Sequence, residues 1–151
     1  MRESDWSSDV CSSDLEYEVD EDHLDALSVA IKTNEDITRI FKTLVLLNEK
    51  KEMIVACIPG LEKLDLKKLA KISGSKKVEM LPMKDLFSMT GYLRGGCSPI
   101  AIKKRHTAFI HNSATDNETI LISGGLRGLQ IEISPQKLID YLNLKVADII
   151  E

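Results

Sequence analysis

The stretch FKTLVLLNEKKEMIVACI, residues 41–58, contains two runs of aliphatic and β-branched residues that are separated by the polar residues EKK. Such runs are typical of β-strands, and a short polar connection between them is typical of a hairpin. The stretch therefore predicts two antiparallel strands in the core of the protein.

Outside this hairpin, the sequence alternates between strand and helix patterns. The predicted strands lie at 16–19, 76–81, 107–112, 118–123 and 129–134. The predicted helices lie at 22–32, 64–74 and 83–89, and a last one starts at Pro135 behind the N-cap Ser134. In the helix at 64–74, Leu64, Leu66, Leu69 and Ile72 are expected to pack and Gly74 to end the helix, and the helix at 83–89 is expected to end before Gly91. We expect one α+β domain, with a curved, barrel-like mixed or antiparallel sheet that is flanked by helices.

The composition is typical of a globular cytoplasmic protein. The chain has 151 residues, 43% of them hydrophobic, which is enough for one core. The longest apolar run, LVLL, is far shorter than the roughly 20 residues of a membrane helix, and no signal-peptide pattern is present. Cys11, Cys57 and Cys97 form no CxxC pair and the three histidines are scattered, so we expect neither a metal site nor a cofactor.

Residues 5–15, DWSSDVCSSDL, have no helix or strand period. They match one translated reading frame of a widely used DNA-sequencing adapter, residue for residue. Segments that do not belong to the native protein are set aside before a fold is interpreted. We therefore expect residues 1–15 to be a non-native segment and residues 16–151 to form the single domain.

The net charge of −4 conceals three segments of different charge. Residues 1–39 carry 3 basic and 12 acidic side chains, residues 40–105 carry 14 and 6, and residues 106–151 carry 3 and 6. A basic middle segment is typical of a protein that binds an anionic partner such as nucleic acid. A solvated, lysine-rich surface explains the same pattern, and charge alone does not separate the two.

The segment TGYLRGGCSPIAIKKR, residues 90–105, combines three glycines within six residues with a basic triplet. It contains no Asp, Glu or His, and so no general base or metal ligand of the usual kinds. The chain also lacks a nucleophile elbow and a Walker A loop, and Gly124, Gly125 and Gly128 lie within a predicted hairpin rather than before a helix. These patterns alone indicate an α+β domain with an anion-binding surface.

Four stretches carry a resemblance to a known family. FKTLV, LDLKKLAKISGSKKVEML, TGYLRGGCSPIAIKKR and SGGLRGLQIEIS occur in the order and spacing of the YbaK/EbsC family, and the resemblance covers residues 16–151. Members are free-standing aminoacyl-tRNA deacylases related to the editing insertion domain of bacterial prolyl-tRNA synthetase. The chain is most similar to the Cys-tRNA(Pro) deacylases.

The resemblance implies hydrolysis of the ester that joins a wrong amino acid to tRNA(Pro), without a metal or a protein nucleophile. In the cysteine-specific members, the thiol of the substrate attacks its own ester and releases a cyclic thiolactone. Such a reaction needs only an oriented substrate and donors for the developing oxyanion, which the backbone of a glycine loop can supply. The resemblance also makes prolyl-tRNA synthetase a candidate partner that supplies tRNA specificity.

The resemblance implies roles for five residues. Lys42 matches the functional lysine and would hold phosphate or ribose oxygens of the terminal adenosine. Gly95 matches the loop glycine, and with Gly96 it would supply the donor wall of the pocket. Tyr17 matches a pocket tyrosine, and Ser98 would also contact the substrate. Without the resemblance, these residues would be read as a strand-edge lysine, turn and loop residues, and an amphipathic-strand tyrosine.

Gln130 marks a departure from the cysteine-specific pattern, because some members carry an aspartate there. An aspartate could pair with the ammonium of the substrate, whereas glutamine offers only a neutral carbonyl. An alanine-specific deacylase that activates a water and a non-catalytic tRNA-binding module therefore remain alternatives. Cys97 is not expected to be a nucleophile, because nothing nearby in the sequence would lower its pKa.

Eight basic residues are predicted either to contact tRNA phosphates or to form a solvated face. They are Lys67, Lys68, Lys71, Lys76, Lys77, Lys103, Lys104 and Arg105.

Overall fold

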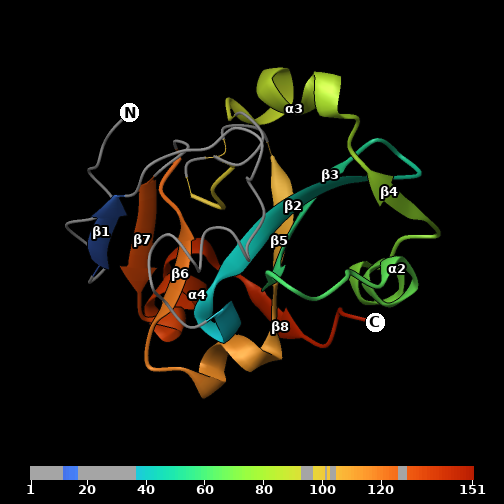
Figure 1. Ribbon diagram of the computed structural model, residues 1–151. Coiled ribbons are helices and arrows are strands. Elements are labelled where there is room, and N and C mark those ends of the chain that lie inside the picture. Colours follow the sequence, from blue (N-terminus) through green and yellow to red (C-terminus); the bar gives the residue numbers. More distant parts are fainter. Residues whose placement is uncertain (1–11, 17–36, 93–96, 101, 103–104, 126–128) are drawn as a thin grey trace.

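The computed structural model describes residues 12–16, 37–92, 97–100, 102, 105–125 and 129–151 (Figure 1). The chain forms two β-sheets. The smaller sheet has the strand order β1 (Ser12–Glu16), β7 (Leu129–Ile133), β6 (Ile120–Ser123). The larger sheet has the order β4 (Val78–Met80), β2 (Phe41–Asn48), β3 (Met53–Pro59), β5 (His106–His111), β8 (Lys145–Ala147).

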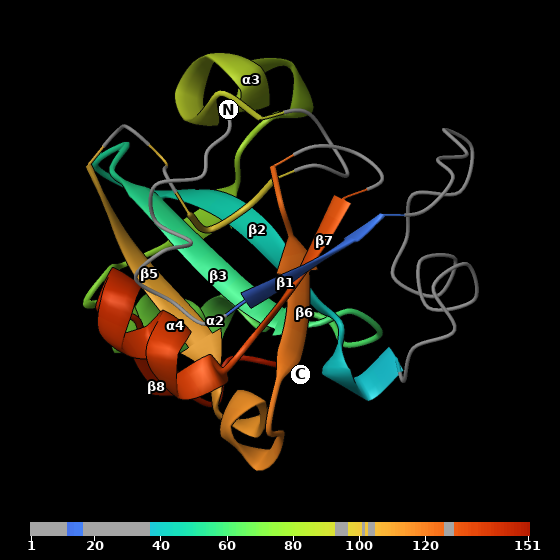
Figure 2. The same cartoon turned by 90° about the vertical axis from the view of Figure 1, so that its left-hand side faces the viewer.

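The described helices surround these sheets. They are α2 (Leu66–Ser73), α3 (Met83–Thr90), α4 (Pro135–Leu142) and the short 3₁₀ helices η2 (Ile37–Arg39) and η3 (Asn112–Asp116). In both views α3 lies at one end of the strands and η3 at the other (Figures 1 and 2). Ser134 caps α4, and Gly74 and Gly91 end α2 and α3 in the left-handed conformation, as predicted.

The predicted hairpin is confirmed. β2 and β3 pair antiparallel from Phe41 opposite Pro59 to Leu47 opposite Met53. β3, β5 and β8 then run parallel, so the larger sheet is mixed and the α+β prediction is confirmed. β3 is buried on both faces, which explains its unbroken apolar sequence.

Two apolar clusters cover the faces of the larger sheet. One lies between the two sheets and includes Val55 and Cys57 of β3 together with Ile122 and Ile131 of the smaller sheet. The other lies on the opposite face, where α2 contributes Leu69. Successive residues of a strand point to opposite faces of the sheet, so alternate residues of β3 belong to one cluster and the residues between them to the other.

The two sheets meet where β2 begins. Ile40, which directly precedes β2, forms a single parallel bridge with Leu121 of β6. Farther along, β2 pairs with β4 from Leu46 to Asn48. Within the described strands both sheets are open, so the barrel-like closure remains a prediction.

Three details differ from the sequence-based predictions. Leu66 and Ile72 were expected to pack, but they are 40% and 41% exposed, because the short helix α2 buries only Leu69 and Ala70. β8 was not predicted, because its three residues contain no apolar run. β1 was not predicted, because residues 12–15 were set aside as non-native; of the strand predicted at 16–19, only Glu16 lies within the described residues. β1 pairs with β7 through backbone groups, which need no particular side-chain pattern.

Candidate active site

Lys42 lies near the start of β2, beside the point where the two sheets meet. Its partner on β3 is Ile58. The side chain is half-buried, and this burial lowers the pKa of the Lys42 ammonium, while the carboxylate of Glu62 acts in the opposite direction. A partly desolvated ammonium of this kind is suited to hold an anionic group as a point charge.

Gln130 lies on the same side of the strands as Lys42. Ile40 and Leu121 are bridged, and Lys42 and Ser123 each lie two residues farther along their strands. Ser123 in turn pairs with Gln130 across the β6–β7 hairpin. Because residues two apart on a strand share a face, Lys42, Ser123 and Gln130 form a row on one face.

The side chain of Gln130 is buried without full hydrogen bonding. The residue is 6% exposed, and its Oε1 has no hydrogen-bond partner among the described residues. A buried acceptor left unpaired costs about 1–3 kcal/mol of stability, so native proteins rarely tolerate one without a functional reason. A ligand that donates a hydrogen bond to this oxygen would remove the cost.

The described residues on both sides of the glycine loop are held in place. Before the loop, Tyr92 donates its hydroxyl hydrogen to the carbonyl oxygen of Ile100. After it, the buried Ser98 Oγ accepts a hydrogen bond from the Ile100 N–H at 3.2 Å. The ring of Tyr92 lies so close to Gly125 that a Cβ there would be 3.0 Å from Tyr92 Cε1. These contacts place Tyr92, which directly precedes the loop, against the β6–β7 hairpin that carries Gln130.

The two described cysteines are buried thiols. Burial raises the pKa of Cys97 to about 11 and that of Cys57 to about 12. Such thiols are protonated near neutral pH and are poor nucleophiles. The result agrees with the expectation that Cys97 has no nucleophilic role.

Some predicted site residues lie outside the described residues, namely Tyr17, Gly95, Gly96, Lys103 and Lys104. Of the other predicted basic residues, Lys67, Lys71, Lys76 and Lys77 line a shallow cavity of about 300 Å³ between α2 and β4. Arg105 is exposed.

Lys68 has intramolecular partners instead. Its Nζ lies 3.2 Å from Asp148 Oδ2 and donates to the carbonyl oxygen of Ile150 at 2.9 Å. The lysine cavity lies near the Asn48 end of β2, six residues and about 20 Å from Lys42.

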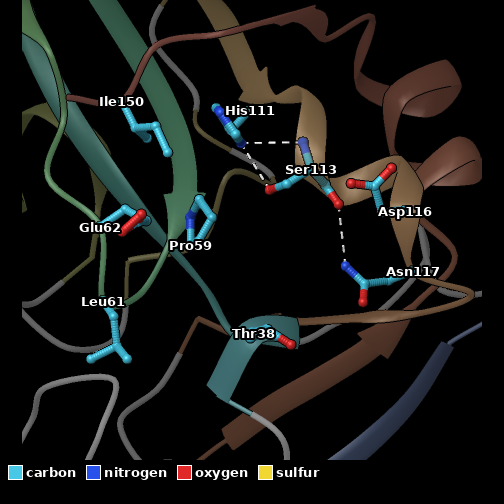
Figure 3. A pocket seen from close by; sticks show the side chains of 9 residues that line it. All are labelled: Thr38, Pro59, Leu61, Glu62, His111, Ser113, Asp116, Asn117 and Ile150. Carbon is cyan, nitrogen blue, oxygen red and sulfur yellow. Dashed lines mark hydrogen bonds between the residues drawn. The ribbon is translucent and has the colours of Figure 1, made fainter.

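A second, larger cavity of about 430 Å³ opens at the ends of β3 and β5 (Figure 3). It is lined by Thr38, Pro59, Leu61, Glu62, His111, Ser113, Asp116, Asn117 and Ile150. None of these residues was predicted as a site residue. They come from four separate stretches of the chain, 38, 59–62, 111–117 and 150, so no single sequence motif could have indicated the cavity.

Two further findings concern cofactors and membranes. Within the described part of the chain, no three His, Cys, Asp or Glu side chains are placed to hold a metal ion. No helix in the described residues is long and apolar enough to cross a membrane.

The chain is similar to known proteins over most of its length. A family model described as the aminoacyl-tRNA editing domain matches residues 21–141. EbsC of Enterococcus faecalis, named as a candidate Cys-tRNA(Pro)/Cys-tRNA(Cys) deacylase, is 48% identical over 136 residues, which are 90% of this chain and 83% of that protein.

Solved structures show the same fold at lower identity. The crystal structure of a candidate trans-editing enzyme for prolyl-tRNA synthetase has a TM-score of 0.82 and 21% identity, with 93% of this chain and 87% of that chain covered. The crystal structure of a hypothetical protein has a TM-score of 0.85, again at 21% identity, covering 93% and 91%.

Proposed function

The chain belongs to the aminoacyl-tRNA editing domain family, in its YbaK/EbsC group, and we propose that it deacylates tRNA(Pro) mischarged with cysteine. The relative that is 48% identical is named for this substrate. The observation that carries the proposal in the structure is the buried Oε1 of Gln130, which lies on the same face as Lys42 and has no hydrogen-bond partner within the described part of the chain.

In this proposal the substrate lies across the row of Lys42, Ser123 and Gln130. Lys42 holds a phosphate or ribose oxygen of the terminal adenosine, and Gln130 Oε1 accepts a hydrogen bond from the α-ammonium of the amino acid. A carboxylate at this position would add a charge pair, whereas the amide adds only a dipole. Recognition of the ammonium is therefore weaker here than with an aspartate.

In this mechanism the nucleophile is the thiol of the substrate. The thiol sulfur bonds to the acyl carbon, the ester C–O bond breaks, and the ribose oxygen leaves as a hydroxyl with the proton that the thiol gives up. Water then opens the cyclic thiolactone to cysteine. Backbone N–H groups of the glycine loop, with Gly95 and Gly96 as the proposed donors, stabilise the oxyanion of the tetrahedral intermediate.

The test is the release of amino acid from pre-charged Cys-tRNA(Pro) and Ala-tRNA(Pro). We expect cysteine to be released at least tenfold faster than in buffer. Lys42→Ala should lower this rate at least tenfold, whereas Lys50→Ala, an exposed lysine in the β2–β3 turn, should not change it. If only alanine is released, an activated water replaces the thiol mechanism. If neither ester is lost faster than in buffer, the protein is a non-catalytic tRNA-binding module.

Two contacts with larger partners belong to the same proposal. We expect four exposed lysines to contact tRNA phosphates: Lys67, Lys71, Lys76 and Lys77. Replacing any one of them by alanine should reduce the slope of the logarithm of the tRNA-binding constant against the logarithm of the salt concentration by about one. Prolyl-tRNA synthetase would supply tRNA specificity in the cytoplasm. A synthetase that neither co-purifies with the protein nor raises its deacylation rate would contradict this partnership.

The N-terminal segment is also part of the proposal. We attribute residues 5–15 to translated adapter sequence, treat residues 1–15 as a non-native segment and assign the editing domain to residues 16–151. Mass spectrometry of the protein from its natural source tests the assignment, because detection of a peptide that spans residues 5–15 would contradict it.

A further inference from the structure

The cavity at the ends of β3 and β5 has the chemistry of a pocket for a neutral, hydrogen-bonding ring. Pro59, Leu61 and Ile150 form apolar walls, and the described lining residues include no lysine or arginine. Glu62 and Asp116 place carboxylates in the walls, and within the described residues neither side chain has a hydrogen-bond partner (Figure 3). Carboxylates repel phosphate but accept hydrogen bonds from N–H groups.

The polar wall of the cavity is held by its own hydrogen bonds. His111 Nδ1 accepts a hydrogen bond from the Ser113 N–H at 3.1 Å, and it lies 2.8 Å from Ser113 Oγ. His111 Nε2 lies 3.4 Å from Asp148 Oδ1. Asn117 Nδ2 donates to the carbonyl oxygen of Ser113 at 3.3 Å (Figure 3). The wall is therefore a preorganised surface, which lowers the entropy cost of binding a small ligand.

The cavity lies beside Lys42. Lys42 of β2 pairs with Ile58 of β3. The preceding residue of β3, Cys57, pairs with Ile110 of β5 in a parallel arrangement. The next residues, Ile58 and His111, therefore lie side by side, and His111 continues the row that starts at Lys42. Neighbouring strands are about 4.8 Å apart, which places His111 about 10 Å from Lys42 along this row. Glu62 is close enough to Lys42 to interact with it electrostatically. The cavity and the site at Gln130 therefore lie on opposite sides of Lys42.

We propose that this cavity binds the adenine base at the 3′ end of the tRNA. The inference rests on the proposed function, in which Lys42 holds the phosphate or ribose of that nucleotide. An adenine offers a flat apolar face to Pro59 and Ile150, and its exocyclic amino group can donate to Asp116 or Glu62. The nucleotide then spans Lys42, with its base in the cavity and its aminoacyl group toward Gln130.

The first test is binding, which needs no catalysis. The ¹⁵N-labelled full chain is titrated with adenosine, with purine riboside, which lacks the amino group, with ribose, and with ethylammonium. We expect adenosine to shift the amide resonances of Ser113 and Asn117. Purine riboside should bind about five- to tenfold more weakly, the value of one hydrogen bond. The inference is overturned if purine riboside or ribose binds as well as adenosine, if ethylammonium gives the same shifts at equal concentration, or if the shifts lie elsewhere.

The second test uses two exposed carboxylates that follow each other closely in the chain. Asp116 lines the cavity and Glu118 does not. Asp116→Asn should weaken adenosine binding and raise KM for Cys-tRNA(Pro) about fivefold with kcat within twofold, and Glu118→Gln should change neither. Equal effects of the two substitutions would contradict the inference.

The two proposals fail in different ways. Adenosine binding in the cavity without hydrolysis of any ester would overturn the proposed function alone. Ester hydrolysis without adenosine binding in the cavity would overturn the adenine pocket alone.

Discussion

Replacement of Gln130 by methionine should make the protein more stable and less active. The side chain is 6% exposed and no described residue pairs with its Oε1, so the folded state carries the cost of a desolvated acceptor. Methionine has nearly the same length and shape but no oxygen to hydrate. The substitution therefore removes this cost without opening a large cavity.

The expected size of the gain follows from two opposing effects. An unpaired buried acceptor costs about 1–3 kcal/mol, and the loss of any hydrogen bond from the amide nitrogen costs about 1 kcal/mol. The net gain in unfolding free energy is about 1 kcal/mol. For a chain of this length, 1 kcal/mol raises Tm by about 2–4 °C.

Thermal unfolding followed by circular dichroism measures this gain, and the deacylation assay measures the loss of activity. The matched control is Gln136→Met on α4, where the amide is exposed and bonds to Asp140 at 3.0 Å. We expect this control to change unfolding free energy by less than about 0.5 kcal/mol. A lower Tm for Gln130→Met would refute the reasoning, because it would mean that the amide is fully satisfied in the free protein.

Three further predictions follow from the structure. Gly125→Ala should lower stability by about 2 kcal/mol, because the φ of +98° disfavours alanine and the added Cβ crowds an aromatic ring at 3.0 Å. Hydrogen bonds from Thr119 and Arg39 lower the pKa of Glu132, so its stabilising effect is present above about pH 4.3 and is lost as the pH falls through the lower folded-state pKa. Glu132→Gln should therefore lose less stability than the wild type between pH 6 and pH 3 in urea titrations. Cys97→Ser should keep kcat/KM for Cys-tRNA(Pro) within twofold, because this buried thiol is not a nucleophile.

Each of these predictions has a control or a contrary outcome. Gly74 also has a positive φ but no atom within 4 Å of an added Cβ, so Gly74→Ala should cost only about 1 kcal/mol. Equal losses at Gly74 and Gly125 would show that the ring contact is unimportant. An equal loss of stability in Glu132→Gln and in the wild type between pH 6 and pH 3 would contradict the role of Glu132. A hundredfold loss of activity in Cys97→Ser, with the fold intact by circular dichroism, would restore a catalytic role for that thiol.

Local sequence patterns predicted the elements whose residues interact with near neighbours. The β2–β3 hairpin, the cap of α4 at Ser134 and the ends of α2 and α3 all depend on residues a few positions apart. The burial of Gln130 could have been inferred only in part, because strand alternation gives a face but not what covers it.

Features that depend on distant segments were not predictable in this way. The cavity beside Lys42 combines the ends of β3 and β5 with η2, η3 and the C-terminal residues. β8 forms because β5 offers an unpaired parallel edge, not because its own sequence favours a strand. The exposure of Leu66 and Ile72 likewise depends on how much of α2 the sheet can cover. Only the assembled fold contains this information.

The single bridge between Ile40 and Leu121 has a consequence for how the molecule opens. Backbone hydrogen bonds hold each sheet together, but the two sheets are joined mainly by side chains of their shared core. In native-state hydrogen exchange, the amides of β6 and β7 should therefore exchange through a separate opening of lower free energy than those of β2 and β3. A substrate that spans Lys42 and Gln130 would tie the two units together and slow this exchange.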